Sequence, residues 1–139
     1  MRKLSVCIPG HPDMTCHASV GETVVLPCVS TSSEELNISH SKLYWQKEDD
    51  VVHFLHEGHD DLKSQDKQYH GRTSLFLHEV KHGNFSLKLS NVQPQDEAVY
   101  SCIYSQYGHQ TKISKIKLSV SGKNFFLVQR EGAGGSISC

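Results

Sequence analysis

The sequence predicts an all-β fold in which two sheets pack face to face as a sandwich. The 139-residue chain contains nine candidate strands, most with alternating apolar and polar residues, and no convincing helix. Its single tryptophan, Trp45, lies in one of these strand-like runs. Residues 96–102 have the sequence Asp-Glu-Ala-Val-Tyr-Ser-Cys, and another cysteine, Cys28, lies far upstream. Together these three observations favour a β-sandwich over a helical or mixed fold.

This order of residues resembles that of an immunoglobulin sandwich: a cysteine, a tryptophan in a strand, and a tyrosine two residues before a second cysteine. The resemblance implies that Cys28 and Cys102 form a disulfide between the two sheets and that Trp45 packs against it. It also implies that the Tyr100 hydroxyl bonds to nearby backbone and holds the turn before its strand. Nine strands indicate the variable-type (V-set) version, which has two additional strands.

The N-terminal half of the chain begins with residues 1–13, which show no periodicity and are predicted to be irregular. In the second predicted strand, Val24, Leu26 and Cys28 alternate and therefore share the face that points to the core. In the third predicted strand the same alternation points Trp45 inward. The predicted strands of this half are 14–19 as an edge strand, 22–28, 42–47 and 51–56, with a polar loop at 29–41.

The C-terminal half begins with a polar loop, residues 57–70, that contains at most one short strand. Farther on, Phe85, Leu87 and Leu89 alternate with polar residues, as expected for a strand with one buried face. The last predicted strand loses its alternation at residues 114–115, which predicts a β-bulge there. The predicted strands of this half are 72–77, 84–90, 98–104 and 111–120.

Three motifs also resemble a particular family. They are Gly-Asn-Phe-Ser-Leu-Lys-Leu-Ser-Asn-Val at 83–92, Pro-Gln-Asp-Glu at 94–97 and Tyr-Ser-Cys at 100–102. They resemble the membrane-distal V-set domain of the butyrophilin and T-cell costimulatory-ligand family. The resemblance covers residues 14–121, which we expect to form the domain. Residues 122–139 are expected to form a disordered tail, because the strand pattern stops after Val120 and residues 132–136 have the composition of a flexible linker.

The same resemblance carries over two further features. Arg72 and Asp96 match the positions that form the V-set salt bridge beneath the sandwich, which implies a role in stability. The sequence Tyr-Gly-His-Gln at 107–110 stands where antigen receptors have Phe-Gly-x-Gly, which argues against an antigen receptor.

The family binds its receptors through the sheet that contains the predicted strands 42–47, 98–104 and 111–120. The resemblance therefore implies a protein-binding face on this sheet. Alternation places Tyr44 and Ile103 on the outer side of this sheet. Strand 51–56 adds either Val52 and Phe54 or Val51 and Leu55, depending on its register. We assign the receptor-binding face to Tyr44, Gln46, Phe54, Ser101, Ile103 and Tyr107.

The predicted function is therefore an extracellular ligand that binds an immunoglobulin-type receptor on lymphocytes and modulates T-cell activation by costimulation or coinhibition. Two alternatives stay open. One is a homophilic adhesion protein that forms a homodimer through the same face. The other is a soluble truncated decoy. The parent protein is expected in the plasma membrane, and this chain is expected to be secreted or a fragment.

Cysteine usage and two glycosylation motifs favour the extracellular compartment. The chain has five cysteines. Besides the predicted disulfide, Cys7, Cys16 and Cys139 are expected to lie outside the sandwich and to be variably paired. The sequons at Asn37 and Asn84 predict N-linked glycans.

Other classes of function are disfavoured. A formal net charge of −1 gives no bulk field for nucleic acid. No nucleophile elbow or phosphate-binding glycine loop occurs, so no enzyme, cofactor or small-molecule substrate is expected. His53, His56 and His59 recur every three residues, but strand alternation sends the first two to opposite faces. We therefore expect solvated surface histidines and no metal site.

Overall fold

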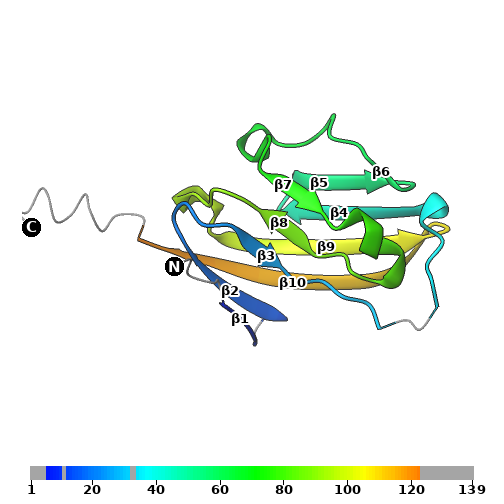
Figure 1. Cartoon of the computed structure of the whole chain (residues 1–139), viewed down its shortest axis with the longest axis horizontal. Coiled ribbons are helices and arrows are strands. Elements are labelled where there is room, and N and C mark those ends of the chain that lie inside the picture. Colours follow the sequence, from blue (N-terminus) through cyan, green and yellow to red (C-terminus); the bar gives the residue numbers. More distant parts are fainter. Residues whose placement is uncertain (1–5, 11, 32–33, 123–139) are drawn as a thin grey trace, which may run out of the picture.

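The computed structural model of the protein describes residues 6–10, 12–31 and 34–122. These residues form two β-sheets that pack face to face (Figure 1). The larger sheet has seven strands in the order β1-β2-β10-β9-β4-β5-β6, and the smaller has three in the order β3-β8-β7. The prediction of an all-β sandwich of two sheets is confirmed.

The strands of the larger sheet are β1 (Val6–Pro9), β2 (Met14–Ser19), β4 (Ser41–Lys47), β5 (Asp50–His56), β6 (His59–Asp60), β9 (Ala98–Gln106) and β10 (His109–Ser121). Those of the smaller sheet are β3 (Val24–Leu26), β7 (Thr73–Leu75) and β8 (Leu87–Leu89). Four 3-10 turns lie between strands: η1 (Ile38–His40), η2 (Lys67–Tyr69), η3 (Leu77–His82) and η4 (Pro94–Asp96). None of the helices in the described part of the chain has the length and apolar character needed to span a membrane.

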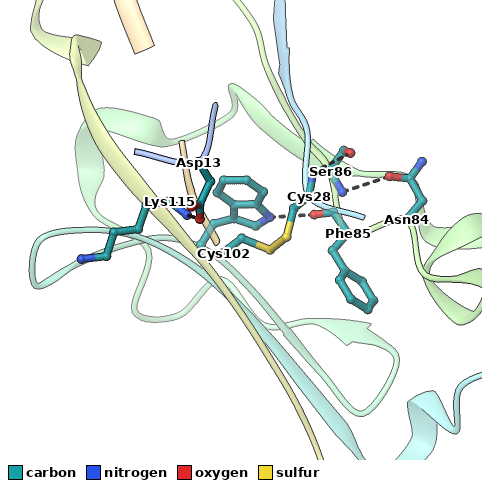
Figure 2. The surroundings of a disulfide bond; sticks show 8 residues. Asp13, Cys28, Asn84, Phe85, Ser86, Cys102 and Lys115 are labelled. Atoms are coloured by element: carbon teal, nitrogen blue, oxygen red, sulfur yellow. Dashed lines mark hydrogen bonds between the residues drawn. A yellow bond between two sulfur atoms is a disulfide. The ribbon is translucent and has the colours of Figure 1, made fainter. Parts of the chain in front are cut away.

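The two sheets are joined through a core made by the alternating inward residues of their strands. Trp45 is fully buried, and its indole Nε1 donates a hydrogen bond of 2.8 Å to the carbonyl oxygen of Phe85, in the segment that leads into β8 of the smaller sheet. The disulfide between Cys28 and Cys102 crosses the same region, beside Phe85 (Figure 2). The predicted inter-sheet disulfide is therefore confirmed.

The N-terminal segment differs from the expected irregular stretch over residues 1–13. Val6–Pro9 forms β1, which pairs antiparallel with β2, and Cys7 lies directly opposite Cys16. These two cysteines form a second disulfide, so they are bonded to each other and not variably paired. A four-residue strand is too short to show a recognisable periodicity in the sequence. It is ordered by its pairing with β2 and by the disulfide. Met14–Ser19 is consequently an inner strand, with β10 on its other side.

Two predictions along the C-terminal half need correction. The register of β10 against β9 shifts between Gln110 and Lys112, and it runs without a break through Ser114 and Lys115. The alternation of apolar and polar residues breaks in the sequence because the apolar Ile113 occupies an outward position, where it is 53% exposed. The strand predicted at 72–77 ends at Leu75, and the chain then turns into η3. The predicted tail at 122–139 lies, apart from Gly122, outside the described residues.

Candidate functional site

The outer face of the larger sheet is built by the same alternation that fills the core. In β4, Leu43 and Trp45 are fully buried, so Tyr44 between them points away from the smaller sheet. In β9, Cys102 and Tyr104 point inward and leave Ile103 on the outer side.

The register places four outward apolar residues side by side. Tyr44 lies opposite Ile103 on one side and Phe54 on the other, and Ile103 lies opposite Ile113. Residues directly opposite across neighbouring strands have side chains in contact range. The result is a continuous band across β10, β9, β4 and β5, here called the apolar row: Ile113, Ile103, Tyr44 and Phe54.

Aromatic stacking holds one end of the apolar row in place. The rings of Tyr44 and Phe54 stack with centroids 4.2 Å apart and an interplanar angle of 6°. The His56 ring continues the stack at 5.5 Å from the Phe54 ring. Because both neighbours cover it, Phe54 is only 9% exposed. Phe54 therefore supports Tyr44 and offers little surface of its own.

Polar residues border the apolar row on both sides. Gln46 lies opposite Ser101, which in turn lies opposite Lys115. On the other side, Lys42 lies opposite Ser105. Both lysines are exposed. The face therefore has an apolar centre with a polar, basic border.

The register of β5 matches neither of the two alternatives expected from the sequence. A shift between Trp45 and Gln46 makes Val52 an extra residue in the pairing. Consequently Val51, opposite Gln46, and Phe54, opposite Tyr44, share the outer face, whereas Val52 is fully buried. A β-bulge of this kind breaks strict alternation and cannot be located from apolar residues that occupy both faces of a strand.

Tyr107 lies beyond the end of the apolar row, in the turn between β9 and β10. Its φ of 52°, followed by Gly108 at 79°, gives the left-handed pair that a two-residue hairpin turn requires. The side chain is 58% exposed, and its ring stacks on His40 with centroids 5.0 Å apart.

Ile113 is the residue of this face that the sequence analysis missed. Strand alternation could have revealed it. Leu118 and Ile116 point inward, so Ser114, two residues before Ile116, also points inward, and its neighbour Ile113 points outward. The sequence analysis interpreted the break in alternation at residues 114–115 as a bulge, so Ile113 was not assigned to the outer face.

The residues implicated in stability form a hydrogen-bonded cluster at the opposite end of the sandwich from Tyr107. Arg72 donates two hydrogen bonds to the fully buried Asp96 carboxylate, at 2.8 and 3.0 Å. Asp96 Oδ2 also accepts from the Gln93 backbone at 2.7 Å. The hydrogen bond to Asp96 raises the pKa of Arg72. The guanidinium therefore stays charged and balances the buried carboxylate.

Two tyrosines extend this cluster into the core. The Tyr100 hydroxyl donates to the Asp96 carbonyl oxygen at 2.5 Å, which ties strand β9 to the preceding turn η4. Tyr69 lies 3.0 Å away, hydroxyl to hydroxyl. Burial raises the pKa of Tyr69 to about 12 and that of Tyr100 still further. Both hydroxyls therefore remain neutral hydrogen-bonding groups.

His53 contradicts the expectation that the histidines are solvated. It lies on the same face as Trp45 and is 1% exposed. Its ring nitrogens bond Thr73 Oγ1 at 2.8 Å and Asp60 Oδ1 at 2.9 Å, so both are satisfied. Nothing in the sequence marks this pairing, because Thr73 comes from a different sheet. Within the described ranges, no three His, Cys, Asp or Glu side chains come together as a metal site.

The two predicted glycosylation sites lie on different parts of the molecule. Asn37 is exposed and precedes η1 in the loop before β4. Asn84 lies beside η3, in the chain that leads to β8 of the smaller sheet (Figure 2). Its amide donates to Glu79 Oε1 at 2.7 Å.

Comparison with known proteins agrees with this architecture. The sequence profile of the family described as "Immunoglobulin V-set domain" matches residues 11–121. Mouse "Programmed cell death 1 ligand 1" is 34% identical over 99 residues, which is 71% of this chain and 34% of that protein. Human "V-set domain-containing T-cell activation inhibitor 1" is 38% identical over 86 residues, covering 60% of this chain and 30% of that protein. The chain thus spans about a third of the length of these relatives.

A solved structure gives a similar result. A chain from the crystal structure of ICOS in complex with ICOS-L and an anti ICOS-L VNAR domain superposes with a TM-score of 0.72 at 26% sequence identity. The match covers 76% of this chain and 53% of that chain.

Proposed function

The protein belongs to the immunoglobulin V-set family, and from this premise we propose that it is an extracellular ligand for an immunoglobulin-type receptor on lymphocytes. It docks through the outer face of β10, β9, β4 and β5 and thereby modulates T-cell activation. The observation that carries the proposal is the apolar row. A sheet face that contacts only solvent is expected to carry polar side chains, so an apolar row on this face indicates a binding partner.

The physical argument rests on where the row lies. An isolated exposed isoleucine is ordinary protein surface, but Ile113, Ile103 and Tyr44 occupy adjacent positions on three neighbouring strands. Protein-binding patches have this form: a compact apolar and aromatic centre with a polar border. A flat sheet face of four strands suits an interface of about 1,600 Å² or less.

The names of the relatives support an immune role. One is called a ligand of programmed cell death 1, and another is called a T-cell activation inhibitor. Because this chain spans about a third of their length, its receptor, the sign of its signal and its attachment to a membrane are part of the proposal.

The second candidate function is homophilic adhesion, in which two copies pair through the same face. The apolar row favours self-association, but its border opposes it. Lys42 and Lys115 flank the row, and repulsion disfavours every pairing of two such faces in which lysines of the two copies meet. The basic border suits a partner with acidic side chains around an apolar centre, so we favour a different protein as the partner.

The test is binding of the full secreted chain to a panel of immunoglobulin-type lymphocyte receptor ectodomains, with sedimentation velocity run in parallel. We expect Tyr44→Ala to lower the affinity about tenfold or more, because it removes both its own contact and the cover over Phe54.

Val25→Ala is the matched control, since Val25 is 40% exposed on β3 of the other sheet and should leave binding unchanged. A folded protein that binds no receptor but sediments as a dimer would replace the ligand proposal with adhesion.

A further inference from the structure

The loop before β4 is joined to the tip of the β9–β10 hairpin by four contacts. The Tyr107 backbone N–H donates to the His40 carbonyl oxygen at 2.9 Å, and the two rings stack. The Asn37 backbone N–H donates to Gln106 Oε1 at 3.1 Å. The Asn37 side-chain Nδ2 donates to the Tyr107 hydroxyl at 2.6 Å. Figure 1 shows η1 beside this hairpin at one end of the sandwich.

Asn37 is also the first residue of a sequon, Asn37-Ile38-Ser39. The Ser39 hydroxyl donates to Asn37 Oδ1 at 2.6 Å, and both residues are exposed. The nitrogen that would carry a glycan is therefore the atom that bonds the Tyr107 hydroxyl. We propose that an N-linked oligosaccharide on Asn37 shields the Tyr107 end of the receptor-binding face and so controls access to it.

The chemistry is ordinary N-glycosylation with a lipid-diphosphate-linked oligosaccharide as donor. A bond forms between Asn37 Nδ2 and the anomeric carbon of the first sugar, and the bond from that carbon to the diphosphate breaks. The lipid diphosphate leaves, and the amide loses one of its two protons. The first sugar is then attached to an atom 2.6 Å from the Tyr107 hydroxyl oxygen. It lies beside Tyr107 whichever way the remaining N–H points.

The surface next to Tyr107 has room for such a glycan. A hollow of about 440 Å³ adjoins the hairpin, and its lining includes His40, Lys42, Glu57, Ser105, Tyr107 and Gln110. These side chains can form hydrogen bonds with sugar hydroxyl groups. Ile103 is four residues from Tyr107, about 13 Å along the strand at roughly 3.3 Å per residue. A glycan on Asn37 therefore covers the hairpin tip and hinders a partner that extends past the apolar row.

The second sequon provides a contrast within the same molecule. Asn84 bonds Glu79 and the Ser86 backbone beside η3, on the side of the smaller sheet. A glycan there lies away from β10, β9, β4 and β5. Of the two predicted glycans, only the one on Asn37 reaches the proposed docking face.

The experiment uses the full chain secreted from glycosylating cells, as wild type and three variants. Ser39→Ala destroys the first sequon but keeps Asn37, Ser39→Thr preserves both the sequon and the hydroxyl, and Asn84→Gln removes the second sequon. We expect mass spectrometry to find a glycan on Asn37 in wild type, Ser39→Thr and Asn84→Gln, and none on Asn37 in Ser39→Ala. Receptor affinity should rise about fivefold in Ser39→Ala and stay unchanged in the other two variants, because the clash with the partner is lost only there.

This inference rests on the proposed function, so a second readout tests it without a receptor. Nitration of Tyr107 by tetranitromethane should be several-fold slower in wild type and Ser39→Thr than in Ser39→Ala, while nitration of Tyr44 is the same in all. An unoccupied Asn37 in wild type, or equal Tyr107 nitration with and without the glycan, would overturn the shielding. If no variant binds any receptor but Tyr107 is protected, the ligand proposal fails and the shielding stands.

Discussion

Replacing Arg72 with alanine is expected to lower the free energy of unfolding by about 3–5 kcal/mol, because it leaves the Asp96 carboxylate buried without its counter-charge. The Asp96 side chain has 0% exposure, and both of its oxygens accept from the guanidinium. Urea unfolding followed by Trp45 fluorescence measures the loss, since this tryptophan is buried in the folded state.

Two variants make the result specific to the paired geometry. Arg72→Lys keeps the positive charge but cannot donate two parallel hydrogen bonds, so it should fall between wild type and alanine. Lys88→Ala removes an exposed lysine from β8 and should change stability by no more than about 0.5 kcal/mol. A loss below about 1 kcal/mol in Arg72→Ala would show that water or a rearranged side chain satisfies Asp96.

Removing the inter-sheet disulfide is the second large effect. Cys28 and Cys102 are 74 residues apart, and the chain-entropy estimate for such a loop is about 4 kcal/mol. The Cys28→Ala, Cys102→Ala double variant should therefore be largely unfolded at 37 °C, as measured by thermal unfolding in circular dichroism.

The second disulfide provides the internal comparison. Cys7 and Cys16 are only 9 residues apart, so the same estimate gives about 2.5 kcal/mol for their removal. This pair also joins only β1 to β2 at the edge of the larger sheet. If the Cys7→Ala, Cys16→Ala variant were less stable than the Cys28→Ala, Cys102→Ala variant, loop entropy would not explain how the two disulfides stabilise the fold.

The features that could be predicted from the sequence are those in which local pattern and tertiary environment agree. The pattern of Cys28, Trp45, Tyr100 and Cys102 predicted a sandwich with an inter-sheet disulfide, and the structure contains both. Alternation in β4 is strict, so the outward position of Tyr44 followed directly.

The features that could not be predicted depend on pairing partners that no local sequence pattern reveals. β1 exists because it pairs with β2 and is cross-linked by Cys7 and Cys16. The bulge at Val52 decides which residues of β5 face outward, and apolar side chains on both faces of that strand conceal it. His53 is buried because Thr73 and Asp60 satisfy its two nitrogens.

The affinity of a matched pair of variants, Ile103→Arg and Val25→Arg, tests the central claim most directly. Each places a charge at an outward apolar position, one in the middle of the apolar row and the other on the smaller sheet. Once a receptor has been identified, both variants are measured against it by surface plasmon resonance, after circular dichroism shows that both are folded. The account predicts that Ile103→Arg weakens binding about 30-fold or more while Val25→Arg has no effect. Equal affinities, or a loss confined to Val25→Arg, would show that the receptor binds elsewhere and would contradict the proposed face.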